Sequence, residues 1–235
     1  MKRDSYFVKE DRILPVFLLV DTSGSMRGEK IETVNIALKE MLNSFQKIKS
    51  PKGIINLCIV AFGNNGVEVI KPLSPIADND SYTFFADGMT PMGEAFSVVS
   101  DMIEDYSVLS ERAYYPSIIL ISDGNPTDFE DYKENMPIEK IMEWPELQKL
   151  LQGSRSSKSV RLAMGIGGDV DTTVLRAFIN DSTIPVIKAY ETDTISKFFD
   201  WVSMSISVRS VSINPNQVKI PEPEIFDKDE VDFGQ

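Results

Sequence analysis

The sequence contains no histidine among its 235 residues. Histidine is the commonest general base and a frequent zinc ligand, so its absence excludes Ser-His-Asp triads and His-based zinc sites. Catalysis by carboxylates, or by a metal held on oxygen atoms, stays open. Any chemistry in this chain therefore depends on Asp, Glu, Ser and Thr.

Cysteine and long apolar runs are also scarce. Cys58 is the single cysteine, so no internal disulfide can form, and its apolar neighbours predict a small buried side chain. No apolar run approaches the roughly 20 residues that a membrane-spanning helix needs, and the first residues show no signal-peptide pattern. These absences predict a cytoplasmic protein, kept reduced and without a membrane span.

Positive charge is in deficit, because 24 Lys and Arg stand against 36 Asp and Glu and give a net charge of −12. Nucleic-acid binding requires clustered Lys and Arg, so nucleic acid is not a predicted partner. An acidic surface is compatible with cation binding, although most of this charge serves solvation.

Short apolar runs alternate with amphipathic segments along the chain. The runs typical of strands buried on both faces cover residues 16–20, 54–62, 116–122, 160–166 and 185–189. Apolar residues recur at helical spacing over residues 31–48, 95–106, 147–151, 174–179 and 195–206. Residues 67–70 follow an Asn-Gly-type turn and predict a hairpin strand. This alternation of strands and helices predicts an α/β fold: a doubly wound, mostly parallel sheet with one antiparallel edge strand and helices on both faces.

We expect one folded domain over residues 13–212. A charged N-terminal segment, residues 1–12, precedes it, and an acidic C-terminal tail, residues 213–235, follows it. The tail contains proline and has no apolar periodicity, which predicts a segment that is flexible or packs in extended form.

Side chains with oxygen atoms follow the predicted strands at several points. Asp21, Ser23 and Ser25 alternate after the first strand, so that all three can face one point. Thr90 precedes a predicted helix, and Asp123 ends a central strand. Ligands of open α/β sheets bind at the carboxyl ends of the strands, so these five residues can meet there. Their oxygen atoms match Mg²⁺, with Mn²⁺ or Ca²⁺ as alternatives.

Most of these residues, taken singly, also have a structural interpretation. Ser25 can cap the helix after it, Thr90 can be the N-cap of the next helix, and Asp123 can belong to an ordinary turn. The acidic residues of loop 128–131 are expected to be solvated rather than to form a rim around a metal. The occurrence of all the oxygen-bearing residues in order favours a metal site.

Three pieces of the chain together resemble the metal-ion-dependent adhesion site (MIDAS) of von Willebrand factor A (vWA) domains. They are Asp-Thr-Ser-Gly-Ser-Met at 21–26, Gly-Met-Thr-Pro-Met-Gly at 88–93 and Ile-Ser-Asp-Gly at 121–124. The resemblance covers roughly residues 14–207 and implies a vWA, Rossmann-like fold. It also implies that Ser23, Ser25 and Thr90 supply hydroxyl ligands, that Asp21 and Asp123 act mostly through metal-bound water, and that a partner's carboxylate fills the sixth position.

Further segments look like the small bacterial TerY-type proteins of tellurium-resistance operons. These segments are residues 14–21, 124–128 and 198–207. The resemblance implies a place in a stress-response module with kinase-like or phosphatase-like partners.

The leading hypothesis is a non-enzymatic interaction module that binds an Asp or Glu of a protein partner through Mg²⁺. An alternative is a Mg²⁺-dependent phosphatase of the haloacid-dehalogenase type. That chemistry needs a nucleophilic Asp and a second Asp two residues later, and Ser23 occupies the second place. A third hypothesis is a structural scaffold with a vestigial metal site.

Overall fold

The strands are β1 (Arg12–Thr22), β2 (Gly53–Gly63), β3 (Gly66–Pro75), β4 (Ser117–Ser122), β5 (Val160–Ile166), β6 (Val186–Ala189) and β7 (Val231–Asp232). The computed structural model, which describes residues 12–47, 53–63, 65–134, 136–168 and 170–234, joins them into one sheet of order β3-β2-β1-β4-β5-β6-β7. The five inner strands are parallel, while β3 and β7 are antiparallel edges. The predicted fold class is confirmed, and β7 is a second antiparallel edge that the sequence did not predict.

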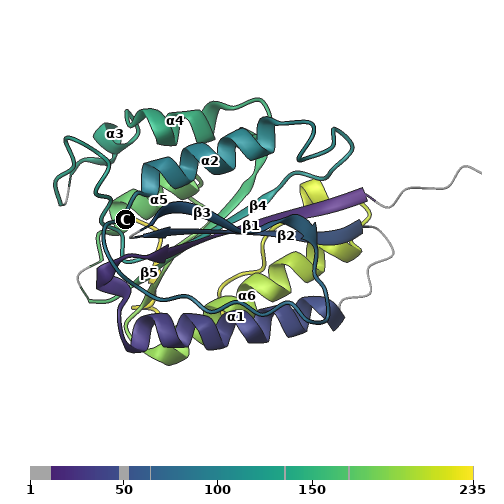
Figure 1. Cartoon of the computed structure of the whole chain (residues 1–235), viewed down its shortest axis with the longest axis horizontal. Helices are drawn as coiled ribbons and strands as arrows, with labels where there is room; N and C mark the ends of the chain where they lie inside the picture. Colours follow the sequence, from purple (N-terminus) through teal and green to yellow (C-terminus); the bar gives the residue numbers. More distant parts are fainter. Residues whose placement is uncertain (1–11, 48–52, 64, 135, 169, 235) are drawn as a thin grey trace, which may run out of the picture.

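The helices are α1 (Glu29–Lys47), α2 (Met92–Glu104), α3 (Ile138–Ile141), α4 (Pro145–Gln152), α5 (Thr172–Ile179) and α6 (Thr192–Val211). As Figure 1 shows, α1 and α6 lie on one side of the sheet, and α2, α3 and α4 lie on the other. Residue 48, predicted to be helical, lies outside the described residues, as do residues 1–11 of the predicted N-terminal segment. Among the helices that these residues form, none has the length and apolar character needed to cross a bilayer.

Both faces of β1 are buried, because its successive side chains point to opposite layers. Leu14, Val16, Leu18 and Val20 join the core beneath α1 and α6. Phe17 and Leu19 join the core beneath α2, α4 and α5. The apolar run therefore fixes β1 at the centre of the sheet, and its polar end at Asp21 emerges at the carboxyl edge.

The described part of the C-terminal tail packs against the domain, but it is not extended throughout as predicted, because it contains a short 3₁₀ helix at Pro215–Gln217 and turns between residues 224 and 230. Trp201 on α6 donates a hydrogen bond from its indole N–H to the Pro221 carbonyl (2.9 Å). The ring of Phe226 meets the same indole edge-on, with centroids 6.0 Å apart. Farther along, β7 pairs with β6. The tail thus covers part of α6 and closes one edge of the sheet.

We expect Phe226→Ala to lower the free energy of unfolding by about 3 kcal/mol, because it removes a nearly buried ring from the contact with Trp201. Phe233, in the same tail, is 42% exposed. Its replacement by Ala is expected to cost less than about 1 kcal/mol. Urea unfolding of the two variants measures the difference, and equal losses would contradict the observed packing of the tail.

Candidate metal centre

Three loops meet at the carboxyl edge of the sheet. The first loop, residues 21–26, begins with the last two residues of β1 and contains the turn Gly24–Met26. The second, residues 86–91, precedes α2. The third, residues 122–128, begins with the last residue of β4. The strand register brings the first and third loops together, since Val20 of β1 pairs with Ile121 of β4. The predicted site residues are thereby distributed over three adjoining loops.

Backbone hydrogen bonds tie the second loop to both of the others. The Gly24 N–H donates to the Gly88 carbonyl (2.9 Å), where Gly88 has a positive φ of 73° that suits glycine. The Thr127 N–H donates to the Thr90 carbonyl (3.0 Å), and the Thr90 N–H donates to the Thr127 hydroxyl (2.9 Å). Thr90 is therefore fixed between the first and third loops.

The Asp21 carboxylate is fully buried and accepts two hydrogen bonds. One comes from the Ser23 N–H (2.8 Å) and the other from the Ser122 hydroxyl (2.6 Å). Ser122 in turn accepts a hydrogen bond from the Gly124 N–H (3.0 Å) and so links Asp21 to the third loop. Sequence reasoning missed Ser122, because its place beside Asp21 depends on the pairing of β1 with β4.

Burial raises the pKa of Asp21 to about 6, even though its hydrogen bonds to Ser122 and Ser23 act in the opposite direction. The negative charge of Asp123 adds to the rise. A buried carboxylate with a second one close by is an environment that a cation stabilises. The negative charges of Asp21 and Asp123 are therefore compatible with a bound metal cation.

The hydroxyl groups of Ser23 and Ser25 lie 3.0 Å apart. Ser23 is buried, whereas Ser25 is exposed, so the pair reaches from the interior to solvent. Thr90 and Asp123 are both nearly buried on the loops beside them. The structure therefore places all five predicted residues at one edge of the sheet, three of them directly joined by hydrogen bonds.

Two structural interpretations of these residues are not observed. The Ser25 hydroxyl contacts Ser23 rather than a helix N–H group, and Thr90 is not the N-cap of α2, since that position is Pro91. Instead the Asp128 carboxylate caps α2 from the third loop, accepting from the Gly93 and Glu94 N–H groups (3.1 and 2.9 Å). Asp128 is exposed, as expected for a solvated loop, and its role as a helix cap was not predicted.

A metal ion at this edge would need hydroxyl oxygens among its ligands. Among the described residues, no three His, Cys, Asp or Glu side chains gather into a group that could hold an ion. The two carboxylates and three hydroxyl groups form a donor set made only of oxygen, which fits Mg²⁺, Mn²⁺ or Ca²⁺ better than softer metals.

Comparison with known proteins identifies the family. Residues 16–201 match the von Willebrand factor type A domain. The chain therefore belongs to the vWA family, whose domains are generally non-enzymatic protein-interaction modules. A comparison with curated proteins gives no match.

Several solved structures share the fold at low identity. A von Willebrand factor type A protein from Catenulispora acidiphila is 17% identical with a TM-score of 0.61, over 83% of this chain and 43% of that one. The vWF domain of the type V pili tip protein Mfa5 from Porphyromonas gingivalis is 9% identical with a TM-score of 0.61, over 86% and 97%. Proximal thread matrix protein 1 from the mussel byssus, with a zinc-occupied MIDAS motif, is 15% identical with a TM-score of 0.58, over 84% and 48%. This chain thus spans less than half of the first and third proteins.

We expect Asp21→Asn to stabilise the metal-free protein at neutral pH. Folded Asp21 keeps its proton up to about pH 6, whereas the unfolded chain loses it near pH 3.8. The unfolded state therefore binds fewer protons between these values, and ionisation of Asp21 removes up to about 3 kcal/mol of stability as the pH rises through them. Asn cannot ionise. Its amide oxygen can accept from the Ser23 N–H, and its NH₂ group can donate to the Ser122 hydroxyl oxygen, which reverses the direction of that bond.

Urea unfolding in metal-free buffer from pH 4 to pH 7 measures this effect. The advantage of Asp21→Asn over wild type should grow with pH and level off above the folded pKa. Asp200→Asn, an exposed change on α6, is the matched control and should show no such growth. An advantage that stays constant with pH would contradict the raised pKa of Asp21.

Proposed function

We propose that this vWA domain is a metal-dependent protein-interaction module. Its metal ligands are Asp21, Ser23, Ser25, Thr90 and Asp123, and its output is the binding of a protein partner. The observation that carries the proposal is the buried Asp21 carboxylate, which Ser23 and Ser122 hold at the meeting point of three loops.

The oxygen atoms of these five residues indicate how the site would bind a metal ion and, through it, the carboxylate of a partner. We assign the hydroxyl groups of Ser23, Ser25 and Thr90 to direct contact with the ion, and Asp21 and Asp123 to contacts through water. Mg²⁺, when bound, supplies the positive charge that attracts an Asp or Glu carboxylate of the partner. Ser25 is the exposed member of the set, so the partner approaches from its side.

The cellular role follows from the resemblance to TerY-type proteins. We place the domain, over residues 13–212, in a cytoplasmic stress-response system of the tellurium-resistance type. Its partners are proteins that offer an acidic side chain, including kinase-like or phosphatase-like members of the same operon. The absence of histidine and the buried Cys58 are compatible with this assignment.

Phosphatase chemistry is the less supported alternative. Asp21 is buried and bonded on both oxygens, so neither oxygen is poised to attack a phosphate ester. The general acid of that mechanism has no counterpart, because Ser23 stands two residues after Asp21. These observations favour binding over catalysis.

We expect Asp123→Ala to abolish or strongly weaken the binding of Mg²⁺, because it removes one of two carboxylates that balance the charge of the ion. Calorimetric titration of wild type and variant with Mg²⁺ measures the loss. Asp200→Ala on the exposed face of α6 is the control and should bind as wild type does.

The same titration, together with an assay for turnover of a phosphate ester, separates the three hypotheses. Wild-type protein that gives no saturable binding heat would favour a vestigial site and contradict the proposal. Turnover of a simple phosphate ester that disappears in Asp21→Asn would favour the phosphatase. Binding of Mg²⁺ without turnover supports the interaction module.

A further inference from the structure

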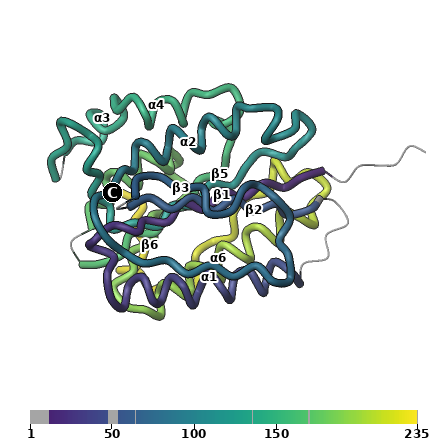
Figure 2. The backbone as a smooth tube through the Cα atoms, in the orientation of Figure 1, coloured from purple at the N-terminus to yellow at the C-terminus, as the bar shows by residue number. Residues whose placement is uncertain are grey.

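Residues 76–91, which we call the strap, join β3 to α2 and contain the predicted ligand Thr90. The strap has no helix or strand of its own. Structureless loops longer than about 12–15 residues are uncommon in compact domains and usually have a function. Figure 2 shows the strap running beside α1 toward the carboxyl edge of the sheet. It is a long connection that ends in the candidate metal centre.

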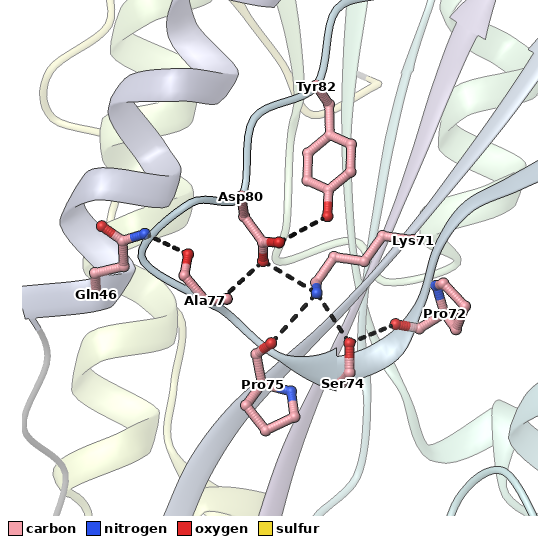
Figure 3. Close-up of polar contacts among 8 residues, drawn as sticks. All are labelled: Gln46, Lys71, Pro72, Ser74, Pro75, Ala77, Asp80 and Tyr82. Atoms are coloured by element: carbon pink, nitrogen blue, oxygen red, sulfur yellow. Dashed lines mark hydrogen bonds and ion pairs between the residues drawn. The ribbon is translucent and has the colours of Figure 1, made fainter.

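The first anchor of the strap is Asp80, whose carboxylate is shown in Figure 3. One oxygen lies 3.0 Å from the Lys71 ammonium of β3 and accepts a hydrogen bond from the Ala77 N–H (3.0 Å). The other oxygen accepts a hydrogen bond from the Tyr82 hydroxyl (3.0 Å). Asp80 thereby closes the beginning of the strap into a turn and fastens it to β3.

This anchor is shielded from water. The side chains of Lys71 and Asp80 are only 7% and 15% exposed. Burial by itself raises the pKa of Asp80, but the hydrogen bond from Ala77 and the contacts with Lys71 and Tyr82 outweigh it and lower the pKa. Removing the Asp80 charge leaves the Lys71 ammonium nearly buried without its counter-ion, which is costly.

The second anchor is Asn35 on α1. Its amide group pairs with both backbone groups of Phe84: the side-chain NH₂ donates to the Phe84 carbonyl (3.0 Å), and the side-chain oxygen accepts from the Phe84 N–H (2.7 Å). The Phe84 ring is buried in the core beneath α1 and α6. Asn35 thus fixes the middle of the strap in both position and orientation.

The strap reaches the first loop directly after the second anchor. The Asp87 N–H donates to the Thr22 carbonyl (2.8 Å), the Arg27 side chain forms an ion pair with Asp87, and the Gly24 N–H donates to the Gly88 carbonyl (2.9 Å). Only five residues, 85–89, lie between Phe84 and Thr90. The anchors therefore limit where the Thr90 hydroxyl can lie relative to Ser23 and Ser25.

We propose that Asn35 and Asp80 are positioning residues of the metal centre, because they hold the strap and through it the Thr90 hydroxyl. Neither residue contacts the ion. With the anchors intact, the whole strap is placed before the ion binds. Without them, only the bonds of Asp87, Gly88 and Thr90 hold its end, so binding must order the rest of the strap and becomes weaker. The inference rests on the proposed metal site and adds what sets its affinity.

The test is a titration with Mg²⁺ of the full chain carrying Asn35→Ala or Asp80→Asn. Each variant is expected to raise the dissociation constant about tenfold, a typical coupling between distant sites. Asn43→Ala is the matched control, because Asn43 is an exposed asparagine on the same helix and has no hydrogen bond to the strap among the described residues. It should bind as wild type does.

Hydrogen exchange separates positioning from general destabilisation. Because coupling is reciprocal, Mg²⁺ is expected to slow exchange of the Phe84 and Asp87 amides in wild type, while amides of β5, such as that of Ala163, change little. In metal-free protein, Asn35→Ala should speed exchange in the strap but leave β5 unchanged. Faster exchange throughout the chain would identify a folding defect and overturn the positioning role.

The outcomes distinguish this inference from the proposed function. If wild-type protein binds no Mg²⁺, the proposed metal site itself is overturned. Wild-type protein that binds Mg²⁺, with both anchor variants binding equally well, leaves the site in place and overturns the role of the anchors. Weaker binding in both variants, with the strap amides responding to Mg²⁺ in wild type, supports it.

Discussion

The buried carboxylate of Asp21 is the constraint on which this edge of the molecule depends. An acid with no exposed surface is tolerated because the Ser23 N–H and the Ser122 hydroxyl each satisfy one of its oxygens. These two bonds also define the geometry, since one turns the first loop back on itself and the other joins β1 to β4. Burial still raises the pKa of the carboxylate, which means that its ionised form is destabilised. A nearby positive charge would stabilise that form.

Much of the fold could be predicted because its signal is local. The apolar runs predicted strands buried on both faces, the helical spacing predicted the long helices, and their alternation predicted a mostly parallel sheet. The short helix α3 and the two-residue strand β7 could not be predicted in this way. Each is too short to have a period of its own, and each depends on packing against residues distant in the sequence.

The candidate site also has a part that the sequence could predict and a part that it could not. The side chains with oxygen atoms could be selected because their types and spacing are visible in the sequence. Their supports could not, because Ser122 is defined by the strand beside it and Asp128 by a helix more than thirty positions earlier. Lys71 and Asp80 meet only because the chain turns back after β3. Supporting residues of this kind leave no pattern in a single sequence.

Charge explains why a site of this composition suits docking. Asp21 and Asp123 together carry the charge that balances one divalent ion, and Lys30 places its ammonium 3.9 Å from Asp123. That ammonium is partly exposed, so solvent weakens but does not remove its effect. It offsets part of the negative charge of Asp123, so a divalent ion bound there as we propose would leave an excess of positive charge at this edge. On a chain with a net charge of −12, a bound ion would make this edge a place that attracts an acidic side chain of another protein rather than repelling it.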